Sequence, residues 1–352
     1  MKKLIGFPRS QPPVWNTFTD APRRTITNKK METLFISRDA KLKRRENTLS
    51  ITVGGRTKPF PIEKLRHLVL LGESSLNTKL LTLCGQNGVR LSVFDYYGYF
   101  KGAFEPIEQN ASGRIKLEQA KLILDNEQRM AIAREVVRGA AHNMRANLAY
   151  YEYRGNKNLS KSIKELNRLI FRIDSTKTSE ELMGVEGNLH IIYFAAWKII
   201  DERLDFGKRV RRPPNNPINC LISFLNQLVY TVTRHETFKT HLDESLSFLH
   251  APSSGRSSLS LDLSEPFKPI LSDGLIFKLV RKNMLNDSWF DQKEGVCLLT
   301  ETGRRNVAEQ FATRLEEQYQ EHSFREWLYQ EALKIERHLL KVAEYQSFKR
   351  KI

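Results

Sequence analysis

The periodicity of the apolar residues changes once along the chain, near Gly113, and this change constrains the fold more than any other feature. Before it, short β-type runs such as Thr33–Ser37, Thr48–Val53 and Val89–Phe94 are separated by glycines, which is typical of strands and tight turns. After it, apolar residues recur three and four positions apart, which is the period of an amphipathic helix. The sequence therefore predicts an α+β protein, with a small β-rich N-terminal domain followed by a larger all-helical C-terminal domain.

Three segments follow from this change of periodicity. Residues 1–30 are rich in Pro, Arg and Thr and have no clear period, so we expect a basic flexible arm. Residues 31–113 form the predicted β-rich domain, and residues 114–352 form the predicted helical domain. Within the β-rich part, Gly54-Gly55 between two apolar runs predicts a hairpin turn. The run Leu76–Cys84 predicts a short helix that ends at Gly85.

The helical part is divided by polar breaks. Asp125-Asn126 separates the run that begins at Ile115 into two predicted helices. Further predicted helices are Ser160–Ile173, Ser179–Leu182, Ile191–Leu204, Pro217–Thr240, Phe267–Lys282, and one or two closing helices within Gly303–Lys349.

The chain is strongly basic, with a formal net charge of +17 from 57 Lys and Arg against 40 Asp and Glu. Residues 1–60 alone hold 14 Lys or Arg and 4 Asp or Glu, although a solvated basic arm would have the same composition. A charge of this sign favours a polyanionic partner, either nucleic acid or an acidic membrane surface. The longest apolar stretch, Ile191–Ile200, is interrupted by Lys198 and is too short to span a bilayer. We therefore expect no membrane insertion.

The three cysteines, Cys84, Cys220 and Cys297, are far apart and form no CxxC pair. This spacing argues against a zinc ribbon and against a disulfide framework. Phe7-Pro8-Arg9 ends the first apolar run at once, so the N-terminus does not have the pattern of a secretory signal. A reducing cytosol, and hence a cytoplasmic protein, is the expectation.

Two residues stand where a ligand-binding side chain is commonly found. Glu186 lies between Gly184 and Gly187 at the predicted start of an apolar helix, where a carboxylate can face a ligand without steric crowding. The same carboxylate would also stabilise a helix N-terminus by about 0.3–1 kcal/mol, so this motif alone leaves both interpretations open. His250 stands between an apolar run and a loop with Pro252, although a lone histidine is more often structural. We expect the other seven histidines to be structural or surface groups: His67, His142, His190, His235, His241, His322 and His338.

A pair of carboxylates follows in the segment Leu259–Pro269. Asp262 and Glu265 are three residues apart, which places them on one face if the segment is helical. Two such acids repel unless a cation or a proton lies between them. Lys268 falls on the same face and could contact a phosphate as a point charge. Two ordinary exposed acids would be the alternative, but Asp262 is embedded among leucines.

Taken together, Glu186, His250, Glu265 and Asp262 supply carboxylates and one imidazole. Carboxylates and water suit Mn²⁺ or Mg²⁺, and the imidazole shifts the preference toward Mn²⁺. Such an ion can polarise a phosphodiester and activate a hydroxyl nucleophile. In a basic protein the expected substrate is DNA or RNA.

Three blocks of the sequence resemble a known family, the CRISPR-associated integrases and endonucleases (Cas1). The blocks are Gly184-Val185-Glu186-Gly187, Phe248-Leu249-His250 and Asp262–Pro269, in this order. Further similarity lies at Lys43–Thr48 and at Arg211-Arg212-Pro213-Pro214, which leads into Asn219. The order of a β-rich and a helical domain is also that of the family, and the resemblance extends from about Met31 to the C-terminal helices.

The resemblance implies a metal-dependent DNA nuclease and integrase that inserts short DNA fragments as new spacers into a CRISPR array by transesterification. By position, Glu186, His250 and Glu265 match the metal ligands, and Asp262 matches an acid that some members use at the same site. Lys268 matches a basic position beside them, and Asn219 matches an asparagine close to the site. We also expect DNA contacts from four residues, which are Lys268, Arg211, Arg212 and Asn219. The implied partners are double-stranded DNA, a small ferredoxin-like adaptation subunit, and a second copy of the chain bound through the β-rich domain as a homodimer.

Two other hypotheses remain open from the residues alone. A non-catalytic nucleic-acid-binding scaffold would use the same charge, and its DNA affinity would fall steeply with salt without any need for a divalent metal. A stand-alone metal-dependent nuclease in DNA repair would use the same residues but would act without the small partner.

Overall fold

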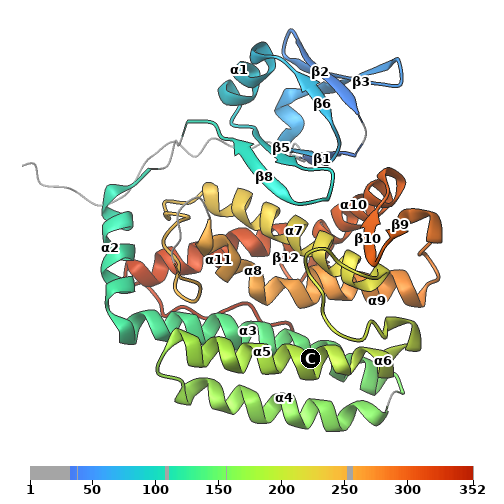
Figure 1. Cartoon of the computed structure of the whole chain (residues 1–352). Helices are drawn as coiled ribbons and strands as arrows, with labels where there is room; N and C mark the ends of the chain where they lie inside the picture. Colours follow the sequence, from blue (N-terminus) through green and yellow to red (C-terminus); the bar gives the residue numbers. More distant parts are fainter. Residues whose placement is uncertain (1–31, 38, 108–110, 156, 252–256, 352) are drawn as a thin grey trace, which may run out of the picture.

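The computed structural model describes residues 32–37, 39–107, 111–155, 157–251 and 257–351. It consists of a β-rich domain above a mostly helical domain (Figure 1), which confirms the predicted α+β class and the order of its parts. The basic arm predicted for residues 1–30, and Met31 after it, lie outside the described residues. The first helix of the helical part begins at Gly113, where the apolar period changes. The division into separate domains at residues 31, 113 and 114 stays a prediction.

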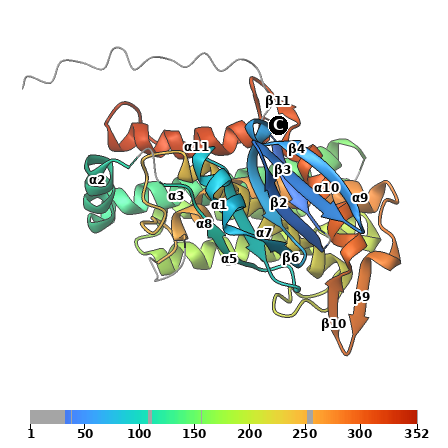
Figure 2. The same cartoon turned by 90° about the horizontal axis from the view of Figure 1, so that it is seen from above.

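Two four-stranded sheets build the β-rich domain. The first has the order β1-β5-β7-β8, in which only the β7–β8 pair is antiparallel. The second has the order β4-β3-β2-β6, in which only the β2–β6 pair is parallel. Seen from above (Figure 2), the strands lie over the helical part, with α1 beside them. Their bounds are β1 Glu32–Ile36, β2 Ala40–Arg45, β3 Thr48–Val53, β4 Arg56–Pro61, β5 Leu65–Leu70, β6 Ser74–Leu76, β7 Arg90–Phe94, β8 Phe100–Phe104 and α1 Thr78–Gln86.

The β3–β4 turn is the predicted glycine hairpin. Gly54 and Gly55 have φ angles of 55° and 77°, and both belong to the left-handed region that favours glycine. The helix prediction after β6 is confirmed, but its end is wrong: α1 continues past Gly85 to Gln86 and is capped by Asn87. Leucines of the strands and of α1, including Leu42, Leu68 and Leu80, form the core between the two sheets.

The helical part is built around α3 and α7, which are long and largely buried on their inner faces. The break predicted at Asp125-Asn126 is confirmed, because Asp125 ends α2 and its carboxylate caps α3 through the N–H groups of Glu127 and Gln128 at 3.0 and 3.1 Å. The bounds are α2 Gly113–Leu124, α3 Asn126–Tyr153, α4 Ser160–Arg172, α5 Ser179–Ala195, α6 Trp197–Ile200, α7 Pro217–Phe238, α8 Ser258–Ser264, α9 Gly274–Arg281, α10 Glu301–Leu315 and α11 Phe324–Leu339.

Three details of this part differ from the sequence-based expectation. The runs predicted as separate helices around residues 182 and 191 form one continuous helix, α5. The C-terminal part is not all-helical, since two hairpins lie within it: β9 (Phe290–Lys293) with β10 (Val296–Leu299), and β11 (Gln318–Tyr319) with β12 (His322–Ser323). The residues after α11 are not helical either, and run back over the domain as an extended segment.

Apolar packing, such as that of Phe35 on Phe311, and a set of polar contacts join the two parts of the molecule. Arg90 of β7 is buried, pairs with Glu105, and donates to the backbone oxygen of Arg234 of α7 at 2.7 Å. Arg234 in turn pairs with Glu244 at 2.8 Å. All three cysteines are buried and free. Among the described residues, no helix is both long enough and apolar enough to cross a membrane.

Candidate metal centre and nucleic-acid interface

Glu186 lies in the interior of α5, not at a helix start as the sequence suggested. The interpretation of its charge as a helix N-terminal stabiliser is therefore wrong, because Thr178 caps that end. A methyl group added at Gly184 or at Gly187 would meet nothing within 4 Å, so both glycines lie on open surface of α5. The side chain itself is 17% exposed.

Glu265 begins a 3-10 turn, Glu265–Phe267, that follows α8 directly. Its carboxylate is almost fully buried and pairs with the ammonium group of Lys268. Two asparagines of α3 hold the turn from behind: Asn143 donates to the backbone oxygen of Pro266 at 2.8 Å, and Asn147 donates to that of Pro269 at 2.7 Å. The turn is thus fixed at both ends, which holds the carboxylate in place.

The structure brings Glu186 and Glu265 together with His190. One ligand atom from each of the three lies within 4.8 Å of the others. The sequence interpretation placed His190 among the structural or surface groups and did not expect it beside Glu186. The signal was present, since His190 stands four positions after Glu186 and therefore lies on the same helix face. It was lost because α5 was predicted as two helices.

His250 is held beside this group by Asp262. The Asp262 carboxylate is fully buried and accepts from the backbone N–H groups of Phe248 (2.7 Å), Leu249 (2.9 Å) and His250 (3.1 Å). It also lies 2.7 Å from His250 Nδ1. This contact leaves Nε2 as the ring nitrogen with which His250 could bind an ion. Metal-binding histidines commonly donate their other ring N–H to a carboxylate in this way.

The segment that carries His250 is fastened further by two helices. Gln119 of α2 donates to the backbone oxygens of Asp243 and Leu246 at 3.0 and 2.7 Å. Arg129 of α3 donates to the backbone oxygen of Phe248 at 2.7 Å. Buried polar contacts of this kind fix a loop in one conformation, so His250 is placed by the fold and not by its own sequence neighbours.

The charges around the site act on its titratable groups. Burial tends to raise the pKa of Glu186, but the His190 imidazole and the charges of Lys268 and His250 outweigh burial and hold this pKa below its ordinary value. Burial tends to lower the pKa of His250, but hydrogen bonding and charge from Asp262, together with the charge of Glu265, raise it above the ordinary value. Glu186 is therefore a carboxylate near neutral pH, as a metal ligand has to be.

Asp273 is a further carboxyl group near this region. It ends a π-helical turn, Pro269–Asp273, and its burial raises its pKa to about 7, partly opposed by His190 and by a hydrogen bond from Tyr193. Single π-helical turns are frequent at functional sites.

The residues expected to contact DNA have different surroundings. Arg211 and Arg212 are exposed, and the Arg212 guanidinium lies over the Tyr99 ring at 5.6 Å from its centre. Asn219 is fully buried. Its amide accepts from Arg209 (3.0 Å) and from the N–H of Val210 (3.2 Å), and donates to Lys208 O (3.1 Å) and to the side chain of Asn215. Asn219 thus fixes the loop before Arg211 and is not available to touch DNA directly.

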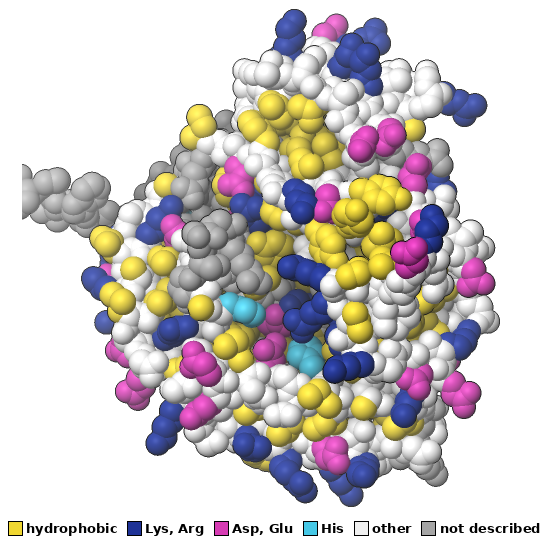
Figure 3. All heavy atoms as spheres, in the orientation of Figure 1, with side chains coloured by type: hydrophobic (Ala, Val, Ile, Leu, Met, Phe, Trp, Pro, Cys, Tyr) yellow, Lys and Arg dark blue, Asp and Glu magenta, His cyan; other side chains and the backbone are white. Residues whose placement is uncertain are grey.

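On the face shown in Figure 3, histidine, acidic and basic side chains gather in a hollow below the β-rich domain. A cavity of about 1060 Å³ lies beside the site, and Lys268, Arg212, Lys116 and Arg234 are among the residues that line it. Glu105, Asp243 and Glu244 also line the cavity, and the excess of basic groups over these acids suits a phosphate backbone.

The donor set is suited to a divalent ion. Two carboxylates would repel at this distance, and a divalent cation removes that repulsion. Oxygen and imidazole donors of this kind bind Mg²⁺, Mn²⁺ or a related ion. A basic α+β protein with such a centre belongs to the class of metal-dependent enzymes that act on phosphodiesters.

Comparison with known proteins names the family within that class. The model of the family described as "CRISPR associated protein Cas1" matches residues 34–313. The "CRISPR-associated endonuclease Cas1 2" of Thermodesulfovibrio yellowstonii is 36% identical over 325 residues, which cover 90% of this chain and 98% of the relative. The chain belongs to the Cas1 family of CRISPR-associated endonucleases.

Solved structures agree with this assignment. A Cas1 protein from Thermotoga maritima is 32% identical and superposes with a TM-score of 0.81, covering 90% of this chain and 100% of the other. A chain of a Cas6-RT-Cas1–Cas2 complex also gives a TM-score of 0.81, over 92% of this chain and 36% of the other. Its identity is 18%, so that likeness concerns the fold alone. The resemblance stated from the three sequence blocks is confirmed.

Proposed function

We propose that this chain is a metal-dependent DNA endonuclease and integrase of CRISPR adaptation, which inserts short DNA fragments as new spacers into a CRISPR array. The observation that carries the proposal is the convergence of Glu186 and Glu265 with the His190 imidazole, next to a cavity that Lys268 and other basic residues line. Membership of the Cas1 family supports the same function.

The proposed metal ligands are Glu186, His250 and Glu265, and the ion is Mn²⁺ or Mg²⁺. When bound, such an ion polarises a phosphodiester and stabilises the charge that develops on its oxygens. Asp262 holds the His250 ring so that Nε2 is free for this purpose. Lys268, paired with Glu265, places a positive charge beside the position of a phosphate.

The proposed reaction exchanges one phosphodiester bond for another. The 3′-hydroxyl oxygen of the incoming DNA forms a new bond to an array phosphorus, while the bond from that phosphorus to the array's own 3′ oxygen breaks. The number of phosphodiester bonds is unchanged, and the proton of the attacking hydroxyl ends on the departing 3′ oxygen or on solvent. The chain's contribution is positioning and charge neutralisation, as in phosphoryl transfer generally.

The proposed DNA contacts are the exposed Arg211 and Arg212 and the partly buried Lys268. Arg212 and Lys268 line the same cavity, so one DNA strand lying along it could be contacted by both. Asn219, predicted from the sequence as a DNA contact, supports this surface from inside by holding the loop from Lys208 to Val210.

We also propose two protein partners. One is the small ferredoxin-like adaptation subunit, Cas2, and the other is a second copy of the chain bound through the β-rich domain. The Cas6-RT-Cas1–Cas2 complex, which has the same fold in one of its chains, supports the first proposal.

An integration assay tests this function directly. Purified chain, a short DNA duplex and a supercoiled plasmid with a CRISPR array are combined with Mn²⁺ or Mg²⁺, with and without the small partner. We expect joined products only with a divalent ion. Glu186→Ala, His250→Ala and Glu265→Ala should each lower the yield at least about a hundredfold, whereas folding and DNA binding are kept.

Glu180→Gln is the matched control, because Glu180 is an exposed acid on the same helix as Glu186 but in its first turn. It should react like the wild type. Wild-type yield from the three ligand variants would contradict the proposed site. Cleavage without array preference and without the partner would favour a stand-alone nuclease, and DNA binding without any metal-dependent reaction would favour a scaffold.

A further inference from the structure

His190 lies on the side of α5 that faces the proposed metal site. It follows Glu186 by one helical turn, and its Nε2 lies 3.7 Å from Glu186 Oε1. Three to four residues along a helix return a side chain to the same face, so the two groups point in a common direction. Both side chains are mostly buried, at 25% and 17% exposure.

The imidazole is held by packing against Phe194 and by its ion-pair contact with Glu186. Its ring stacks on Phe194, one further turn along α5, with 5.3 Å between ring centres and 29° between planes. Its Nδ1 is buried and has no hydrogen-bond partner among the described residues. At 3.7 Å the contact between Nε2 and Glu186 is too long for a hydrogen bond. A buried ring nitrogen without a hydrogen-bond partner, as at His190 Nδ1, is the exception in folded proteins and calls for an explanation.

The separations suit donors that share one ion. Nitrogen and oxygen donors lie about 2.0–2.2 Å from a small divalent ion, so neighbouring donors around it are roughly 3.0–3.5 Å apart. The ligand atoms of Glu186, His190 and Glu265 lie within 4.8 Å of one another, and the His190–Glu186 pair is already near that range. A small rotation of the side chains would bring all three to one ion.

We propose that His190 is a direct metal ligand of this site, additional to the proposed ligands Glu186, His250 and Glu265, and that its nitrogen increases the preference of the site for Mn²⁺ over Mg²⁺. This inference rests on the proposed metal-dependent function. Mg²⁺ takes oxygen donors and retains several waters, whereas transition ions accept imidazole. A nitrogen ligand in place of a water or carboxylate oxygen therefore weakens the binding of Mg²⁺ more than the binding of Mn²⁺.

Binding of Mn²⁺ alone, without DNA, tests the inference. The metal-free full chain is titrated with Mn²⁺ by electron paramagnetic resonance, and the nitrogen couplings of the bound ion are measured by pulsed methods. His190→Gln should weaken Mn²⁺ binding at least about tenfold and remove one nitrogen coupling. His322→Gln, a histidine change on the β11–β12 hairpin, should leave both unchanged.

A second variant keeps the test informative if His190→Gln folds poorly. His190→Glu replaces the nitrogen with an oxygen, and the ratio of Mg²⁺ affinity to Mn²⁺ affinity should rise severalfold above the wild-type ratio. Loss of folding cannot produce such a gain.

The two proposals fail in different ways. If the wild type binds no Mn²⁺, the metal site itself is refuted. If the wild type binds Mn²⁺ and reacts, but His190→Gln keeps the same affinity and the same nitrogen couplings, only the role of His190 is overturned.

Discussion

Asp262 illustrates how a single buried carboxylate can determine where another side chain lies. Its two oxygens accept three backbone N–H groups and contact His250 Nδ1, and the side chain has no solvent exposure. Hydrogen bonds to an ionised acceptor are about twice as strong as neutral ones. From the sequence, Asp262 was expected to share a face with Glu265 and a metal ion, but its oxygens are committed to the His250 segment.

Replacing Asp262 by asparagine should therefore lower activity, because the His250 ring would no longer be held in its present orientation. In Asp262→Asn the amide can present only one acceptor oxygen, so its nitrogen would face one or more N–H donors. We expect Mn²⁺ affinity and DNA cleavage to fall about 10- to 100-fold, as for other groups that orient metal ligands. Isothermal titration with Mn²⁺ and a cleavage assay measure these two effects.

Asp39→Asn is the matched control, since Asp39 is an exposed acid of the β-rich domain. It should change neither quantity. Unchanged Mn²⁺ affinity in Asp262→Asn would show that His250 does not depend on Asp262 for its position.

Individual site residues could be predicted to different degrees. Glu186 and Glu265 were found from their motifs, and the structure brings them together. His190 was missed because Gly184 and Gly187 suggested a break. The buried residues Leu182, Val185, Leu189 and Tyr193 recur at helical spacing through that region. Packing of this apolar face outweighs the low helix propensity of two glycines.

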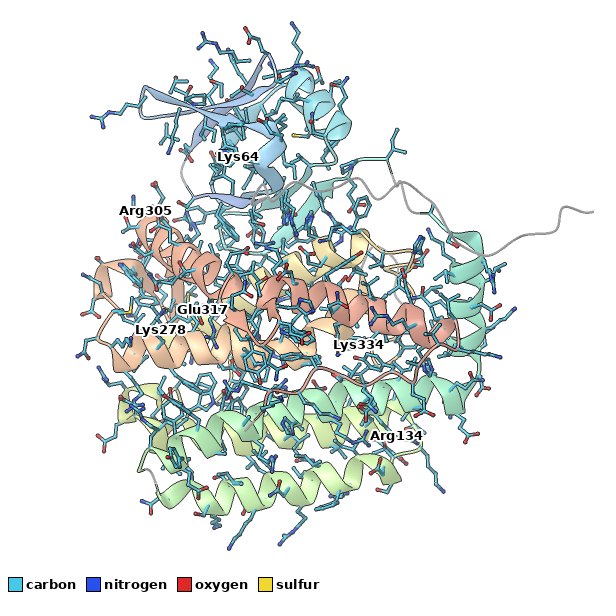
Figure 4. All side chains as sticks on the ribbon, turned by 180° about the vertical axis from the view of Figure 1, so that it is seen from behind. Lys64, Arg134, Lys278, Arg305, Glu317 and Lys334 are labelled. Carbon is cyan, nitrogen blue, oxygen red and sulfur yellow. The ribbon has the colours of Figure 1, made fainter. Side chains whose placement is uncertain are left out.

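At the scale of elements, α3 connects the turn that carries Glu265 to the C-terminal segment. Asn143 donates to Pro266 O and to Phe348 O, and its own oxygen accepts from the N–H of Arg350. The C-terminal segment runs between α11 and α3 in the rear view (Figure 4), where Lys334 of α11 is labelled. Lys334 donates to Gln346 O of that segment at 3.1 Å. The segment therefore braces the Glu265 turn from behind.

A methyl group at Gly139 should disturb this bracing. In Gly139→Ala the new Cβ would lie 2.2 Å from Ser347 Oγ and 2.7 Å from Ser347 Cβ, which forces the C-terminal segment away from α3. We expect a loss of roughly 1–3 kcal/mol in the free energy of unfolding, as for other overpacked sites. Urea denaturation of the metal-free chain measures it.

Gly184→Ala provides the control for helix propensity, because a methyl group there meets nothing within 4 Å. It should leave the free energy of unfolding unchanged or raise it by up to about 1 kcal/mol. Equal effects of the two variants would mean that the contact between Gly139 and Ser347 contributes little.

Helices with a regular apolar period were predicted well from the sequence, whereas the short strands of the C-terminal part were not. The predicted breaks coincide with real helix starts, because Ser112 caps α2 at Gly113 and Asp125 caps α3 at Asn126. The β9–β10 hairpin was missed, although Glu294 and Gly295 both have positive φ and form its turn. Its strands have four residues each, too few for a clear alternation to stand out from the flanking helices.

At the scale of the whole molecule, the β-rich domain is docked on α7 through a buried pair of imidazoles. His67 of β5 and His235 of α7 stack with 4.5 Å between ring centres and 11° between planes. His67 Nε2 lies 2.8 Å from Ser92 Oγ. Neither ring nitrogen of His235 has a hydrogen-bond partner among the described residues. No local sequence pattern predicts this contact, since it depends on how two distant elements meet.

The surroundings keep both rings neutral. Burial is the main cause that lowers the pKa of His67 and of His235 well below 6.5. The cations Arg90, Arg325 and Lys239 lower both further, and each ring is next to the other. The buried Glu236, which pairs with Lys239, is one acidic group at this interface, and Glu105 and Glu244, which pair with Arg90, are others.

Stability should therefore fall as the solution becomes acidic. The folded-state pKa of His235 is depressed, so its contribution is complete above the unfolded value of 6.5 and is lost as pH falls below 6.5 toward the folded pKa. Each such histidine adds a slope of about 1.4 kcal/mol per pH unit in that window. His235→Leu should flatten the dependence by this amount in urea unfolding of metal-free chain between pH 7 and 5. The control is Val229→Ala, which leaves a cavity at a buried position of the same helix and should lower the free energy of unfolding equally at every pH. If His235→Leu keeps the wild-type slope, the pair titrates in the folded state and the explanation is wrong.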